Sequence, residues 1–176
     1  DMLEIIKKRR SIRTYKGKPL SKEIIDSLLE AAKHAPSARN LQQLEYKVIT
    51  NKALIRKMSD RIIAIAKKEN PNIALRALPD PIFYNAPLLV VITGSADNEW
   101  INYDAAIAAE NMMLYATSID LGTCFIGRSV HINKDKELLD ELRVADGKKV
   151  VAAVVCGYAD EEPQEREKKM SAEFFK

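Results

Sequence analysis

The sequence is poor in the side chains that usually bind metals or form disulfide frameworks. It contains only two cysteines, Cys124 and Cys156, and two histidines among 176 residues. No CxxC or HxxxH spacing occurs, which excludes the common structural zinc and iron–sulfur motifs. One possible thiol pair in a chain of this size is not typical of a secreted disulfide scaffold. We therefore expect a reducing, cytoplasmic setting.

The usual catalytic and targeting motifs are also missing. There is no GxSxG elbow, no GxxxxGK[ST] phosphate loop and no GxGxxG turn. No apolar run reaches transmembrane length, and the start of the chain has no signal-peptide pattern, so we expect no membrane association and take Met2 as the native start. Cys124 stands between glycines and could act as a nucleophile with His131, although a buried packing role is the more common one.

The charge balance is mild. The 28 Lys and Arg residues against 25 Asp and Glu residues give a net charge of +3. This balance favours no nucleic-acid partner, and any functional positive charge must be local.

Hydrophobic periodicity predicts one α/β or α+β domain over residues 1–176. The predicted helices are 3–10, 22–35, 52–68, 101–119 and 134–143. The predicted strands are 46–50, 88–94 and 149–157, and residues 121–127 are either a short strand or a loop. Residues 69–87 contain four prolines and read as a long binding loop or lid. The 101–119 helix is apolar nearly all round, so either the domain core or a partner subunit must cover it. Phe174 and Phe175 end a charged tail that we expect to dock on this domain or on another.

A basic cluster near the start of the chain is the main candidate for a binding site. It runs Lys7-Lys8-Arg9-Arg10-Ser11-Ile12-Arg13. Arginine forks and a serine hydroxyl suit a phosphate-bearing ligand, although a solvated basic helix face is an equal alternative. If the first helix continued, Arg9 and Arg13 would share a face. The loop carrying Ser37, Asn40 and Gln42 adds groups that can bind a ring edge, and an organic cofactor would supply the missing catalytic chemistry.

These motifs together resemble the FMN-dependent nitroreductase family. Residues 9–13 match its RxSxR signature, and residues 36–42 match its PSxxNxQ loop. Residues 103–105 resemble the start of the family's dimer helix, residues 121–127 its glycine-bounded flavin segment, and Gly157-Tyr158 its closing motif. The chain departs from the family at Gln43 and Leu44, where a proline and an aromatic residue are usual.

The resemblance implies an α+β fold with a mixed central sheet flanked by helices, in a domain-exchanged homodimer. Arg9 would bind the FMN phosphate with Arg166 and Lys168, Ser11 the phosphate or ribityl region, and Arg13 the pyrimidine edge. Phe125, Ile126 and Gly127 would cover one ring face. The implied cofactor-binding set is Arg9, Arg10, Ser11, Arg13, Pro36, Ser37, Ala38, Asn40, Phe125, Ile126, Gly127, Arg166 and Lys168, with Ser37, Ala38 and Asn40 coming from the other subunit.

The implied activity is an oxidoreductase with no catalytic side chain of its own, in which Arg13 tunes the flavin. NADH or NADPH would reduce FMN, and a small electron-poor acceptor such as a nitroaromatic or quinone would reoxidise it in a ping-pong scheme. Dehalogenation or flavin fragmentation on the same scaffold is one alternative. A non-enzymatic module that binds anions or nucleic acid is another.

Overall fold

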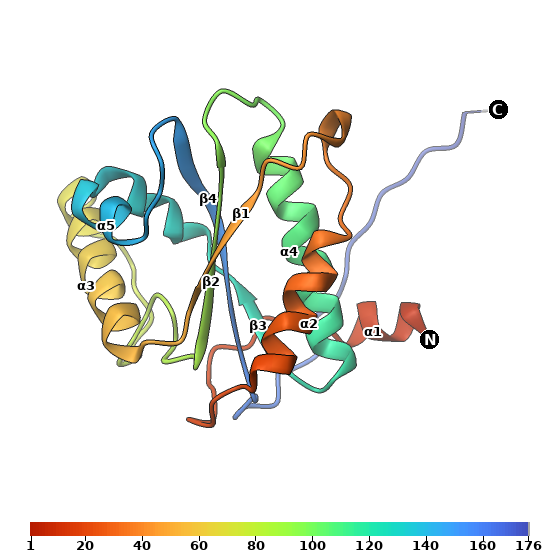
Figure 1. The fold of residues 1–176 in the computed structure, drawn as a ribbon. Helices are drawn as coiled ribbons and strands as arrows, with labels where there is room; N and C mark the ends of the chain where they lie inside the picture. The colour runs from red at the N-terminus through yellow and green to blue at the C-terminus, as the bar shows by residue number, and fades with distance from the viewer. Residues whose placement is uncertain (176) are drawn as a thin grey trace.

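The computed structural model describes residues 1–175 and has three layers, with a central antiparallel sheet between two groups of helices (Figure 1). The sheet order is β1-β2-β4-β3. Its strands are β1 (Glu45–Ile49), β2 (Leu88–Ser95), β3 (Gly122–Phe125) and β4 (Lys148–Gly157). The helices are α1 (Met2–Lys8), α2 (Lys22–Lys33), α3 (Lys52–Glu69), α4 (Ile101–Ser118) and α5 (Lys136–Glu141), with 3-10 turns η1 (Ala38–Asn40) and η2 (Gly127–Lys134). The predicted α+β class is confirmed.

The continuous apolar run of β2 is explained by burial on both faces. Val90 and Ile92 pack with α2 and α4, whereas Leu89 and Val91 pack with α3, η2 and α5. Side chains alternate across a strand, so one run supplies both cores. The register shifts between Ile92 and Thr93, where β4 carries one extra residue.

The first helix is shorter than predicted. It ends at Lys8, and Arg9 is its C-cap with an extended conformation. Ser11 then forms a parallel bridge with Thr123, and the Ile12 amide donates to the Thr123 carbonyl at 2.8 Å. The prediction that Arg9 and Arg13 share a helical face is therefore wrong. In an extended segment, Arg9, Ser11 and Arg13 lie on the same side because their spacing is two.

Close contact with β3 fixes this extended segment. Ile12 is buried, and a Cβ built at Gly122 would lie 2.8 Å from Ile12 Cγ1 and 2.9 Å from Ile12 Cβ. Real Cβ atoms do not approach so closely, so only glycine fits at position 122 without a shift of Ile12.

Gly122→Ala is expected to lower the free energy of unfolding by about 1–3 kcal/mol, because the new methyl group overpacks the contact with Ile12. Gly17→Ala is the matched control, since a Cβ there would meet no atom within 4 Å. Urea denaturation at equal protein concentrations compares the two. Equal stability of both variants would show that Ile12 moves aside at no cost.

The longest helices follow the predictions closely, and of the two docking sites predicted for the tail the structure excludes the one on its own domain. The 101–119 prediction corresponds to α4, whose Ala105, Ala108 and Ala109 are buried whereas Tyr103 and Ile107 are exposed. The tail after β4 is extended and runs past α4 (Figure 1). Phe174 and Phe175 are 88% and 91% exposed, so they do not dock on their own chain. Within residues 1–175, no helix is both long and apolar enough to cross a membrane.

Candidate functional site

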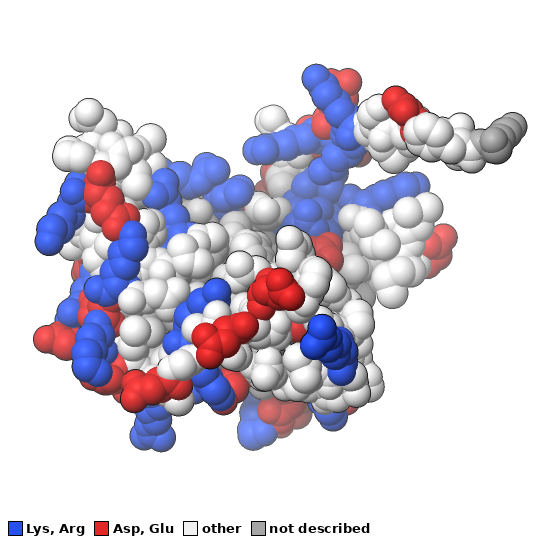
Figure 2. Space-filling model, turned by 90° about the horizontal axis from the view of Figure 1, so that it is seen from above, with Lys and Arg blue, Asp and Glu red and all other residues white. Residues whose placement is uncertain are grey.

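A large cavity brings the two ends of the chain together. It has a volume of about 700 Å³. Figure 2 shows Lys and Arg side chains gathered around a hollow beside the base of the tail. The predicted residues that line this cavity are Arg9, Arg10, Ser11, Arg13, Arg166 and Lys168. The structure thus places the basic cluster and the distant tail cations in one site.

Backbone bonds on both sides hold the extended segment that carries the cluster. One side bonds to β3 through Thr123, as described above. On the other side the Lys16 amide donates to Tyr158 O, and the Asp160 amide donates to Thr14 O, both at 2.9 Å. The Tyr15 hydroxyl also donates to the Ile12 carbonyl at 2.6 Å, and burial raises the pKa of Tyr15 well above its usual range, which keeps this donor protonated.

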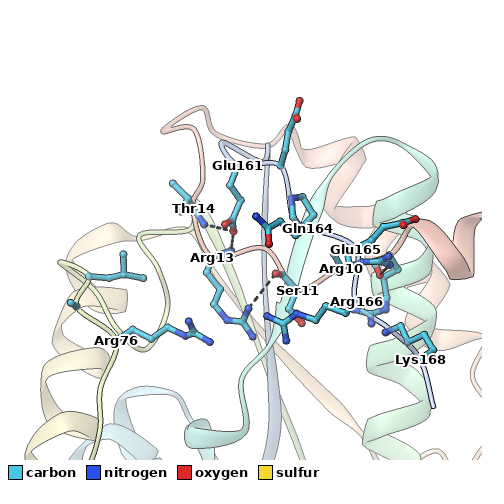
Figure 3. Close-up of a pocket in the computed structure, with 15 residues that line it drawn as sticks. Arg10, Ser11, Arg13, Thr14, Arg76, Glu161, Gln164, Glu165, Arg166 and Lys168 are labelled. Atoms are coloured by element: carbon cyan, nitrogen blue, oxygen red, sulfur yellow. Dashed lines mark hydrogen bonds between the residues drawn. The ribbon is translucent and has the colours of Figure 1, made fainter. Parts of the chain in front are cut away.

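Glu161 binds the backbone of this segment. Its Oε1 accepts from the Arg13 amide and, at 3.1 Å, from the Thr14 amide (Figure 3). No ion pair joins Glu161 to a guanidinium within residues 1–175. This carboxylate therefore fixes the position of Arg13 while leaving its guanidinium available. Sequence reasoning missed Glu161 because its contact lies 148 residues away along the chain.

The cavity has an excess of positive charge. Its lining holds six cationic side chains (Arg9, Arg10, Arg13, Arg76, Arg166 and Lys168) and three carboxylates (Glu161, Glu162 and Glu165). The Nε atoms of Arg10 and Arg13 are buried and have no hydrogen-bond partner. An unpaired buried donor is costly, so this cavity is suited to an anionic ligand that accepts hydrogen bonds.

The cluster arginines are not equivalent. Arg9 Nε lies 3.4 Å from Glu110 Oε1 on α4, which partly neutralises it. The Nη1 of Arg10 donates to the carbonyls of Lys7 and Arg9, so Arg10 also caps α1. Arg13 Nη1 makes a long bond of 3.4 Å to Ser11 O, and its Cζ lies 6.0 Å from the centre of the Tyr84 ring. Of the three, Arg13 is the least committed to other protein groups.

The polar loop after α2 lies apart from this cavity in a single chain. Pro36 and Ser37 line a separate cavity of about 170 Å³ with α2 and α4 residues. Arg39, Asn40 and Gln42 all have positive φ, an unusual backbone region for residues other than glycine. Such conformations cluster at functional sites.

Asp104 and side-chain bonds hold this loop in shape. The Ala38 amide donates to Oδ1 of the buried Asp104 at 3.0 Å, and Asp104 Oδ2 is buried without a partner. The Gln42 amide donates to Ser37 Oγ at 3.1 Å, and Gln42 Nε2 donates to Asn40 Oδ1 at 2.9 Å. Asp104 thus connects α4 to the loop over residues 36–42.

The residues at the end of β3 have different environments. Phe125 is 40% exposed, whereas Ile126 is buried in the core and its amide donates to Ala153 O at 2.8 Å. Burial raises the pKa of the Cys124 thiol, and the nearby charge of Arg13 only partly opposes this effect. Cys124 is therefore a protonated packing residue, as the sequence favoured, and not an activated nucleophile.

Comparisons of the sequence with known proteins give matches to nitroreductases. Residues 6–158 match the sequence model of the Nitroreductase family. A protein of Archaeoglobus fulgidus, provisionally named an NADH dehydrogenase/NAD(P)H nitroreductase, is 28% identical over 162 residues, which cover 92% of this chain and 87% of that protein.

Solved structures share the fold over nearly the whole chain. A nitroreductase with bound FMN from Bacteroides fragilis has a TM-score of 0.83 and 30% identity, covering 98% of this chain and 95% of its own. An FMN-dependent nitroreductase from Clostridium difficile has a TM-score of 0.87 at 23% identity, with 99% of each chain covered.

Proposed function

The chain belongs to the nitroreductase family, and on that premise we propose that it is an FMN-dependent oxidoreductase that uses NADH or NADPH to reduce electron-poor acceptors such as nitroaromatics and quinones. The observation that carries the proposal is the charge of the large cavity. Its lining has six cationic side chains but only three carboxylates, and two buried guanidinium nitrogens there have no hydrogen-bond partner. A volume of about 700 Å³ is within the range of cofactor sites.

The residues present fit the two chemically different ends of FMN. Arg9 and Ser11, with Arg166 and Lys168 from the tail, would hold the phosphate, because these side chains offer several donors and positive charge. Arg13 would lie at the redox ring, where a fixed positive charge stabilises negative charge that develops on reduction. Tyr84 beneath Arg13 supports this assignment, since it restricts where the guanidinium can lie.

We further propose that a second copy of this chain completes the site. Pro36, Ser37, Ala38 and Asn40 would reach the cofactor of the partner subunit, because in one chain they lie apart from the large cavity. The exposed side chains of Trp100, Tyr103 and Ile107 on α4, and of Phe174 and Phe175 in the tail, supply the apolar surface that such a homodimer would bury.

In this proposal, bound FMN supplies the hydride chemistry that links NAD(P)H to the acceptor. The side chains of the protein bind FMN and orient it toward the two substrates. Arg13 stabilises charge, while Phe125 and Gly127 would form part of the wall over the ring. The two substrates would use the same face in turn, which gives ping-pong kinetics. The two free, buried cysteines suit the cytoplasmic setting expected from the sequence.

Purified protein is expected to be yellow, to release FMN on denaturation, and to bleach when NADH or NADPH is added anaerobically. An absorption spectrum from 300 to 600 nm before and after addition measures this, and a nitroaromatic should restore the colour. Colourless protein that does not take up added FMN would contradict the proposal.

A further inference from the structure

A second cavity adjoins the large one, on the side of the irregular segment between α3 and β2. It has a volume of about 330 Å³ and is lined by Ala74, Leu75, Arg76, Pro81, Tyr84 and Arg128. Arg76 lines both cavities. Figure 3 shows its side chain extending from this segment toward Arg13. A ligand in the small cavity would therefore lie beside one in the large cavity.

The charge of the small cavity is unbalanced. Arg76 and Arg128 are its only ionic lining residues, and no acidic residue lines it. Neither guanidinium forms an ion pair with a carboxylate of residues 1–175. Among the described residues, the side chains of this pair make one hydrogen bond, from Arg128 Nη2 to the Ala74 carbonyl at 3.4 Å. Two unpaired cations around one small space repel each other, and an anion between them would remove that repulsion.

The other walls of the small cavity are apolar or aromatic, contributed by Leu75, Pro81 and Tyr84. Tyr84 belongs to a turn in which its amide donates to Asp80 O at 3.0 Å and its φ is 60°. A flat apolar ring with one anionic substituent matches these walls and the two guanidinium groups. Arg76 and Arg128 are distinct from the residues proposed to bind the FMN phosphate, which lie on the side of the large cavity next to the tail (Figure 3).

We propose that Arg76 and Arg128 form a subsite for the carboxylate of an aromatic electron acceptor, so that this enzyme prefers anionic acceptors to their neutral analogues. The inference rests on the proposed function, because it concerns the acceptor of that reaction. Bidentate contacts between guanidinium and carboxylate would orient the acceptor in the site.

The test compares 4-nitrobenzoate with methyl 4-nitrobenzoate, which differ in charge at one substituent. For Arg128→Gln, the ratio of kcat/KM for the acid to that for the ester is expected to fall about 10-fold, the usual effect of losing one charge-assisted contact. Arg76→Gln should act in the same direction. Arg128→Lys should retain part of the preference, because it keeps the charge but not the fork. Lys52→Gln, which removes an exposed charge that lines neither cavity, should leave the ratio unchanged.

A binding measurement separates this inference from the proposed function. Isothermal titration calorimetry with 4-nitrobenzoate, without NAD(P)H, should show about 10-fold weaker binding to either Gln variant whether or not turnover occurs. Equal losses for the acid and the ester, or an effect confined to the KM of NAD(P)H, would overturn the subsite. Colourless protein without turnover of either acceptor would instead count against the proposed function.

Discussion

Asp80→Ala is expected to lower the free energy of unfolding by about 2–5 kcal/mol, because it removes an acceptor shared by several buried donors. Asp80 is 1% exposed. Its Oδ1 accepts from the Ser59 hydroxyl at 2.6 Å, from the Ile82 amide at 3.1 Å and from the Phe83 amide at 2.9 Å, and its Oδ2 accepts from the Asn85 amide at 3.3 Å. Urea denaturation without FMN, at one protein concentration, measures the loss.

Two further variants test whether the hydrogen bonds of Asp80 account for the loss of stability. Asp80→Asn keeps an oxygen acceptor and should lose less stability than Asp80→Ala. Asp60→Ala removes an exposed carboxylate of α3 whose one ionic partner within residues 1–175 is Arg56, and it should change stability by about 0.5 kcal/mol or less. If Asp80→Ala were as stable as Asp60→Ala, the buried bonds would contribute nothing.

The effect of Asp80 should extend to the binding site. The turn that Asp80 binds places Tyr84 and Asn85 at positive φ, and Tyr84 lies under the Arg13 guanidinium. Positive φ is unfavourable for these residues, so the four hydrogen bonds to Asp80 must offset it. If this turn were lost, Tyr84 would no longer be held in the wall of the small cavity or under the Arg13 guanidinium.

Arg13→Ala is expected to weaken FMN binding about 10- to 100-fold and to slow anaerobic reduction by NAD(P)H. The physical reason is the loss of a guanidinium that lines the large cavity with a buried, unpartnered Nε. A charge-assisted bond contributes about 1.5–3 kcal/mol, which corresponds to this range. Quenching of FMN fluorescence gives the dissociation constant, and stopped-flow absorbance gives the reduction rate.

Conservative and remote variants separate charge from shape at position 13. Arg13→Lys keeps the charge and should retain more of the reduction rate than of the binding affinity. Lys52→Ala, at an exposed position outside both cavities, should change neither. An unchanged reduction rate for Arg13→Ala at saturating FMN would refute its role at the redox ring.

Local patterns predicted most elements of this fold. The apolar run at 88–94 corresponds to β2, and the periodic segment at 52–68 corresponds to α3, because each element buries the face that its sequence makes apolar. The first helix was predicted two residues too long at its end. Its basic residues fit a helix by propensity, but pairing with Thr123 of β3, more than 100 residues away, makes the segment extended.

The candidate site was only partly predictable for the same reason. The cluster at Arg9–Arg13 could be found because its charges are adjacent in sequence. The prediction that this cluster lies in one site with Arg166 and Lys168 came from the family resemblance and not from any local pattern. Arg76 and Glu161 were missed, because each acts through contacts that only the folded chain creates. Asp80 was missed although three of its four hydrogen bonds are local, from amides two to five residues further along the chain.

The pairing of Ser11 with Thr123 has a consequence for how the folded protein meets its neighbours in solution. β3 is the last strand of the sheet, and the segment after α1 covers part of its outer edge. An uncovered edge strand is a template for pairing with other chains and so for aggregation. A chain that lacked its first fourteen residues would expose that edge as well as losing Arg9, Ser11 and Arg13. The segment that lines the large cavity therefore also protects the sheet edge from pairing with other chains. We expect a change that loosens this segment to reduce solubility together with the proposed FMN binding.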